Sequence, residues 1–474
     1  MTMYALARRW DRHRAAVVLF LKLSGAAFFV FVFAVMGSSL NYQMYIVFLF
    51  VLMAAIAWRP KTSLVVAALI TCFGAFVRRI LADDGRIDAD PLVLLPVLLA
   101  VVALLYADKK YDGPRDIWQR LVYVTVGVFV LANIAHKLFA VPSLFTLIVQ
   151  CSMLLIVVQV RGGRLPDVWD TVEKLLPIIG TIVAAYGIAQ FFLLFEWDRL
   201  WMLSSKLNSI GQPFVQELRV FGTAESPASF SAVLSAALLA AIARIRATKN
   251  LATQVFLLSG MGAMAFALVL TGVRSALLGL AAALAWMAIS GRGGISRVVP
   301  VGIAVAAGYL VVTVVGKFGD DSSILNANRL TEFDASTDGS AQTRLKLLQL
   351  APEAMLYPLG KGGIAGGGTV NLDNMFVDVL FKAGPFVAIA VVALFVKVMI
   401  DALSIRLDPS ATGASSVAVF FVVFSLSLNP FATANGLIGA LAFGSVMRTA
   451  WLARRAKPDT EQTMKNLTAV ESPR

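Results

Sequence analysis

Long hydrophobic segments recur along the whole chain, and they constrain its fold more than any other feature. A bilayer core about 30 Å thick requires roughly 20 apolar residues for each crossing helix, and somewhat shorter crossings are tolerated. The 474 residues are 59% hydrophobic and 15% charged, whereas a soluble domain averages about 25% charged residues. This composition excludes a soluble enzyme and a disordered chain. The sequence therefore predicts an all-α polytopic membrane protein.

About fourteen segments have the length and composition of membrane-spanning helices. Their approximate ranges are 15–37, 42–58, 64–81, 91–107, 117–136, 141–160, 175–195, 230–245, 251–270, 275–290, 298–316, 384–403, 413–428 and 437–452. The first segment is too long for a cleaved signal peptide, and further spans follow it directly.

Lysine and arginine mark every second connection between these segments, and this pattern predicts the orientation of the chain. Cytoplasmic segments hold 25 of the 41 Lys and Arg with 12 of the 28 acids, while external segments hold 14 basic and 16 acidic residues. The net charge of +13 is therefore a positive-inside bias, and it indicates no nucleic-acid partner. Both termini are expected in the cytoplasm. Lys22 and Lys397 are expected inside spans, without an evident acid in the membrane to pair with.

Two external segments are long enough to suggest a function of their own, because loops above about 12–15 residues are uncommon in compact proteins. The second contains a stretch with helical spacing at 341–356, and a glycine-rich turn, GKGGIAGGG, follows it at 360–368. The candidate site is therefore expected outside the membrane. The predicted parts of the chain are seven spans in 1–195, a periplasmic loop at 196–229, four spans in 230–316, a large periplasmic loop at 317–383, three spans in 384–453 and a cytoplasmic tail at 454–474.

Three external arginines are candidate phosphate ligands, because a guanidinium offers a planar, permanently charged fork to phosphate oxygens. Arg274 stands between two apolar segments, next to Gly272, which lets the backbone approach a ligand closely. Arg219 precedes the span at 230–245, and Arg344 lies on the expected amphipathic helix. Each arginine also has a simpler interpretation, as a side chain that reaches lipid headgroups or solvent.

Two acids, Asp373 and Glu225, are candidate catalytic residues. Asp373 follows the glycine-rich turn where the chain returns to the membrane, so its carboxylate could act as a general base on a sugar hydroxyl. Asp373 or its neighbour Asn374 could instead cap the next helix. Glu225 is close to a membrane boundary, where a salt bridge competes with direct chemistry. No HExxH, Walker, CxxC or GxSxG pattern occurs, so the sequence predicts neither a metal site nor a cofactor.

In their order along the chain, these motifs resemble the O-antigen ligase and polysaccharide polymerase superfamily over roughly residues 210–400. The motifs are RVFGTAESPASF (219–230), LTGVRSALLG (270–279), TRLKLLQLAPEAMLYPLGKGG (343–363) and LDNMFVDVLFKAG (372–384). The resemblance implies a GT-C-like membrane fold and metal-independent, inverting glycosyl transfer at the periplasmic face of a bacterial inner membrane. It also implies that Arg219, Arg274 and Arg344 bind the diphosphate of an undecaprenyl-linked donor.

One position distinguishes members of this superfamily. Its ligases typically carry a His-Asn pair before the returning helix, with the histidine proposed as the base. Asp373 and Asn374 stand at that point here, and the one external histidine, His136, is distant in sequence. This difference favours a polymerase of the flippase-dependent pathway for exopolysaccharide, capsule or O-antigen.

Further residues and partners follow from this polymerase interpretation. Asn374, Lys361 and Tyr357 are expected to contact substrate. The expected partners are undecaprenyl-diphosphate-linked oligosaccharides and the lipid bilayer, with a chain-length regulator and a flippase as additional candidates.

Two other functions stay open. An O-antigen ligase would transfer the glycan to lipid A core. A lipid-linked oligosaccharide flippase or another transporter would account for the many spans, but it is expected to place ionisable residues around a cavity within the membrane.

Overall fold

The computed structural model describes residues 59–81, 93, 95–108, 116–138, 141–205, 210–245, 248–290, 339–362 and 374–470. The predicted spans at 15–37, 42–58 and 298–316 lie outside these ranges. Within them, the regular secondary structure consists of fourteen α-helices and two short 3₁₀ helices, as expected for an all-α protein.

Each of the eleven remaining predicted spans coincides with a helix. These helices are α3 (Pro60–Leu81), α4 (Leu95–Leu105), α5 (Ile117–Ala135), α6 (Val141–Arg161), α7 (Trp169–Leu193), α9 (Pro227–Ile245), α10 (Leu251–Leu270), α11 (Arg274–Ile289), α16 (Pro385–Ser404), α17 (Thr412–Phe424) and α18 (Gly436–Val470). Eight of them are long and apolar enough to cross a bilayer, whereas α4, α11 and the stretch that ends in α17 are shorter. The chain is therefore a multi-pass helical membrane protein with eight candidate spans in the described part.

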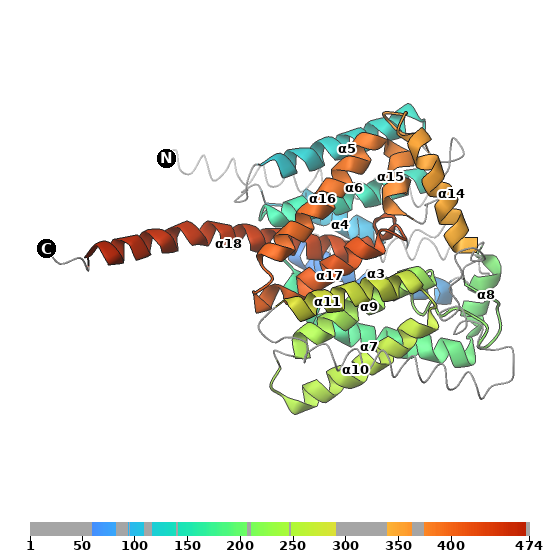
Figure 1. Ribbon diagram of the computed structural model, residues 1–474. Coiled ribbons are helices and arrows are strands. Elements are labelled where there is room, and N and C mark those ends of the chain that lie inside the picture. The colour runs from blue at the N-terminus through green and yellow to red at the C-terminus, as the bar shows by residue number, and fades with distance from the viewer. Residues whose placement is uncertain are drawn as a thin grey trace, which may run out of the picture.

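Three further helices belong to the connections between spans. They are α8 (Glu196–Ser204), α14 (Gly339–Ala354) and α15 (Met375–Ala383). Helices α8 and α14 lie across one end of the bundle, and the last part of α18 projects from the opposite end (Figure 1). We call the first of these the α14 end. The helix expected at 341–356 is confirmed as α14, which packs through Ala354 on Val377 and Phe381 of α15.

Small residues let the central helices approach closely. Helix α9 is rich in alanine and serine and is buried along most of its length. A Cβ atom on Gly180 of α7 would lie 2.4 Å from the Cβ of Ala237 on α9. Close backbone approach through small residues drives helix association in lipid, where apolar side chains gain little from leaving the bilayer. This packing buries α9 among α7, α10, α11 and α17.

Lys397 has an acidic partner, so the expectation that it lacks one is wrong. Its ammonium forms an ion pair with Asp401, one turn later on α16, and Arg454 of α18 donates to the same carboxylate oxygen at 2.6 Å. The Asp401 side chain is fully buried. The pairing satisfies these charges among themselves near the end of the bundle opposite α14, away from the candidate site.

Two 3₁₀ helices complete the connections around α17. They are η3 (Pro409–Ala411), which leads into α17, and η4 (Pro430–Ala432), which lies between α17 and α18. The turn before η4 contacts the start of α15, because Met375 N donates to Ser425 O at 3.1 Å. This contact joins the returning segment to the centre of the bundle.

Candidate functional site

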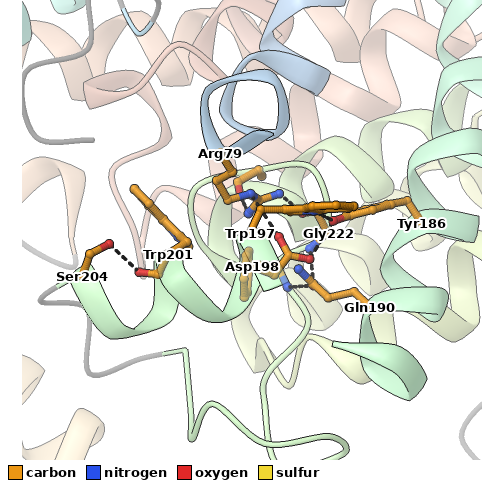
Figure 2. A network of polar contacts seen from close by, with 10 residues as sticks. Arg79, Tyr186, Gln190, Trp197, Asp198, Trp201, Ser204 and Gly222 are labelled. Atoms are coloured by element: carbon orange, nitrogen blue, oxygen red, sulfur yellow. Dashed lines mark hydrogen bonds and ion pairs between the residues drawn. The ribbon is translucent and has the colours of Figure 1, made fainter. Parts of the chain in front are cut away.

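A buried arginine holds the loop of residues 218–226, which carries two of the candidate site residues. Arg79, at the last turn of α3, donates to the carbonyl of Ala224 at 2.9 Å and also to the carbonyl of Gly222. Its Nε lies 3.2 Å from Oδ1 of Asp198 on α8 (Figure 2). The side chains of Arg79 and Asp198 are 1% and 0% exposed. One guanidinium therefore joins α3, α8 and the 218–226 loop.

Asp198 is held from its other side by aromatic residues. Tyr186 of α7 donates its hydroxyl to Asp198 Oδ2 at 2.6 Å, and Trp197 donates Nε1 to the Tyr186 oxygen at 2.8 Å (Figure 2). Burial raises the pKa of the Asp198 carboxyl, and the nearby Arg79 charge opposes that shift. These contacts fix the position of the carboxylate that faces Arg79.

The backbone of the 218–226 loop is also bonded on both sides. The Gln190 side-chain oxygen on α7 accepts from the amides of Phe221 at 3.2 Å and Gly222 at 2.8 Å. On the α3 side, Phe76 N donates to Thr223 O at 3.0 Å. Gly222 has a φ of +49°, and a Cβ there would lie 2.3 Å from the ring of Phe230. A side chain at this position would therefore displace the loop.

Arg219 and Arg274, two of the three candidate diphosphate ligands, meet at one turn. The Arg219 Nε donates to Thr271 O at 3.0 Å, and its Nη2 donates to Gly272 O at 3.1 Å. Arg274 is the first residue of α11 and follows this turn directly. Both arginines are partly exposed. The chain thus brings the Arg219 guanidinium to the turn that the backbone of Arg274 follows.

The start of α11 adds to the positive potential of this turn. Val273 precedes the helix and provides no side-chain cap for its first amides. The first N–H groups of a helix carry a partial positive charge, and they bind anions where backbone and dipole point to the ligand. Gly272 has a φ of +62°, which favours glycine and leaves the backbone uncovered by a side chain. The amides of Gly272, Val273 and Ala276 donate within the protein itself, so what the turn offers to an anionic oxygen is the positive end of α11 together with the arginine side chains.

The Glu225 carboxylate forms an ion pair with an arginine. Its Oε1 accepts from Arg78 Nη1 in an ion pair, and the Glu225 side chain is 39% exposed while that of Arg78 is 7% exposed. This contact ties the start of α9 to the end of α3. It supports the salt-bridge interpretation of Glu225.

The predicted substrate-binding residues lie at both ends of α15, with Asn374 at its start and Lys361 beside its last turn, where Lys361 N donates to Phe381 O at 2.8 Å. Asn374 is the N-cap of this helix, because its Oδ1 accepts from the amides of Phe376 at 3.0 Å and Val377 at 3.2 Å. Its Nδ2 donates to Leu426 O at 2.8 Å. Lys361 forms an ion pair with Glu353 and lies 4.8 Å from the centre of the Tyr357 ring. Each of these residues has a structural contact, and Lys361 and Tyr357 also reach solvent.

Two candidates cannot be placed with the others. Asp373 lies outside the described residues, and so does the side chain of Arg344, although its helix α14 is described. The described part of the chain thus joins Arg219 with the turn before Arg274, and joins Lys361 with Tyr357.

His136 reaches the segment that precedes the glycine-rich turn, which sequence distance gave no reason to expect. Its Nε2 lies 3.0 Å from Leu359 O. A Cβ on Gly362 would lie 2.9 Å from the imidazole Cγ. The glycine run predicts that another part of the chain packs closely on this backbone, but it does not predict that this part is His136. The two arginines at the end of α3 were likewise missed, and their only signal was their position at the end of an apolar segment.

No protein-family model matches the chain, and a search of curated proteins gives no match. We call residues 271–274 together with Arg219 the arginine turn. Its geometry is the basis on which we propose a function.

We predict that Arg79→Met destabilises the protein strongly, by about 3–5 kcal/mol, because it leaves Asp198 buried without its charge partner. Adding Asp198→Asn to this variant is expected to restore part of the loss. A denaturant titration of each purified variant in detergent measures the free energy of unfolding.

A matched control is Lys174→Met, which removes an exposed pair with Asp170 and is expected to cost at most about 1 kcal/mol. Equal stability of the Arg79 and Lys174 variants would contradict the clamping role of Arg79.

Proposed function

We propose that this chain is a membrane glycosyltransferase that polymerises undecaprenyl-diphosphate-linked oligosaccharide repeat units. The observation that carries the proposal is the contact of the Arg219 guanidinium with the turn that leads into Arg274 and α11. Two arginines beside the positive end of a helix suit a diphosphate, because forked cations and a helix start both attract phosphate oxygens.

The reaction follows from this arrangement. A hydroxyl of the acceptor glycan attacks the anomeric carbon of the donor, and the bond from that carbon to the diphosphate oxygen breaks. Negative charge grows on the departing undecaprenyl diphosphate, and the arginine turn stabilises it in the transition state. Because the helices are apolar and lie in the bilayer, the polyprenyl chain can stay in lipid beside them while its diphosphate reaches the turn.

In the proposed orientation, the α14 end faces the periplasm of a bacterial inner membrane. Arg161 and Arg244 end their helices at the opposite end, as the positive-inside bias of the sequence requires. Helix α14 and the following turn then form an external surface beside the returning helix α15, where the glycans would bind.

Asp373 is the proposed general base. It directly precedes Asn374, whose side chain is occupied in capping α15. Glu225 is a weaker candidate because its carboxylate pairs with Arg78. An aspartate of ordinary pKa, about 3.9, is ionised near neutral pH and can accept a hydroxyl proton as the transition state forms.

A ligase is the second candidate function. The observation that favours it is the contact of His136 with Leu359, because it places on the external loop a histidine, the residue type that related ligases use as their proposed base. In a strain that lacks the protein, single repeat units would support a polymerase, whereas complete chains left on the lipid carrier would support a ligase.

We predict that Arg274→Ala reduces polymerisation by about 10²–10³-fold at normal protein abundance, because one donor to the leaving group is lost. Arg274→Lys is expected to rescue poorly, since lysine lacks the fork. Arg219→Ala is expected to act in the same direction with a smaller effect. Glycan length on gels, from cells complemented with each variant, measures the outcome.

Arg199→Ala is the matched control, because Arg199 is an exposed arginine on α8 at the same end of the bundle. It is expected to leave glycan length unchanged. Full-length glycan from Arg274→Ala would show that this arginine has no role with the diphosphate and only reaches the headgroups.

We also predict that Asp373→Asn lowers activity by about 10²–10⁴-fold, as expected for loss of a general base. The change is close to isosteric, so folding is expected to be kept. Glu225→Gln is expected to retain measurable activity. The reverse ranking, measured as chain elongation by purified variants, would move the base to the 218–226 loop, and near-normal activity of both would show that no carboxylate base is needed.

A further inference from the structure

Directly after α14, the chain exposes a run of consecutive apolar residues at the α14 end of the bundle. They are Met355, Leu356, Tyr357, Pro358 and Leu359, and all five are exposed. The exposed fractions of Leu356 and Met355 are 78% and 61%. We call these five residues the apolar turn. Apolar side chains scattered singly over a surface are ordinary, whereas a contiguous exposed run marks a surface that contacts something else.

The apolar turn is held against the ends of two membrane-spanning helices. Leu359 O lies 3.0 Å from Nε2 of His136, which directly follows the last residue of α5. Pro358 O would lie 2.1 Å from a Cβ on Gly384, the residue that precedes α16. Helix α5 is an outer helix of the bundle in Figure 1. The apolar turn therefore lies where the outer surfaces of α5 and α16 end.

Both helices present apolar side chains to lipid next to the apolar turn. Only 28% of the α5 span is buried within the protein, and Leu131 and Ile134 in its last turns are exposed. Phe386 and Ile389, in the first turns of α16, are exposed as well. In a span, such side chains contact the acyl chains of the bilayer. The apolar turn thus adjoins a surface whose partner is lipid.

Helix lengths place the apolar turn at the boundary of the hydrocarbon core. Helix α5 has 19 residues and α16 has 20, so they are about 28 and 30 Å long at a rise of about 1.5 Å per residue. The hydrocarbon core is about 30 Å thick. His136 and Gly384, at the ends of these helices, therefore lie at the level where acyl chains meet headgroups, and the apolar turn lies with them.

Polar groups around the apolar turn fit the same level. Lys361 Nζ lies 4.8 Å from the centre of the Tyr357 ring and forms an ion pair with Glu353. Lys137, after α5, is exposed. Tyrosine and lysine are typical of membrane boundaries, where an apolar stem or ring lies in lipid and the polar tip reaches headgroups or water.

We propose that the apolar turn inserts into the lipid leaflet at the α14 end and anchors the external loop to the bilayer surface. Met355 and Leu356 enter the acyl region, and Tyr357 lies at headgroup level. Interfacial segments of this kind penetrate about 5–10 Å. The anchor fixes how far α14 stands from the membrane. It is independent of the proposed transfer reaction, because it involves neither the arginine turn nor Asp373.

Site-specific fluorescence quenching in nanodiscs tests the anchor. Cys72 and Cys151 are both buried, and alanine replaces them before Leu356→Cys is labelled with nitrobenzoxadiazole. Each disc holds one full-length chain in phosphatidylcholine, with or without a lipid that carries a nitroxide near the headgroup end of its acyl chain. The second quencher is aqueous iodide.

Two exposed positions are the references. Ile134→Cys on α5 reports a lipid-facing site, and Lys346→Cys on α14 reports a water-facing site. We expect the lipid nitroxide to quench the label at 356 about threefold more strongly than the label at 346, because an inserted segment reaches the acyl chains. Iodide is expected to show the opposite ranking. Met355→Cys repeats the test at the neighbouring position if Leu356→Cys folds poorly.

Four results would overturn the anchor. Quenching of both turn positions by iodide and not by lipid would place the apolar turn in water, and protection from both quenchers would show that the chain itself covers it. Equal lipid quenching at 346 and 356 would show that the apolar turn has no special contact with lipid. Iodide access in single-copy discs that is lost in vesicles crowded with the protein would identify a second copy as the partner.

The same samples separate this result from the proposed function. A lipid-quenched label in a protein that forms no glycan linkage would refute the transferase and keep the anchor. Glycan transfer by a protein whose apolar turn lies in water would refute the anchor alone.

Discussion

The ion pair of Arg79 and Asp198 is the interaction on which the candidate site depends. Both side chains are buried. The attraction between their charges therefore offsets the cost of removing them from water only while the two stay together. The same guanidinium bonds the carbonyls of Gly222 and Ala224. A change in the relative position of α3 and α8 would therefore displace the loop that carries Arg219.

The position of Arg219 concentrates positive charge at the turn before α11. Its guanidinium is bonded to the carbonyls of Thr271 and Gly272, which orient it toward the turn that carries Arg274. Two like charges at one partly exposed turn are favourable only with an anion or solvent to separate them. The two carbonyl bonds of Arg219 also spare a bound diphosphate the entropy cost of ordering this side chain, which is the advantage of a preorganised site.

Hydropathy predicted the helices well where a span is continuous and apolar. The stretch at 251–270 was expected as a span and is helix α10 with the same bounds. Spacing also predicted α14, and composition indicated that Asp373 or Asn374 caps the next helix, of which Asn374 is the observed N-cap. In contrast, the expectation for Lys397 was wrong, although Asp401 lies only one turn further along the same helix.

The remaining features join residues that are far apart in sequence, and neither periodicity nor charge counts reveal such pairs. Arg79 with Asp198, Arg219 with Thr271 and His136 with Leu359 are examples. Each depends on how the helices pack, which is decided by the fit of small and large side chains, such as Gly180 against Ala237. The sequence shows which residues could act, and the packing determines which of them meet.

The most direct test of the account is glycosyl transfer by the purified chain. The protein would be reconstituted in liposomes with undecaprenyl-diphosphate-linked repeat units and a metal chelator. The account predicts glycans of two or more repeats and one released undecaprenyl diphosphate for each new linkage. Movement of intact repeat units across the bilayer, with no new linkage and no released undecaprenyl diphosphate, would contradict it and identify the chain as a transporter.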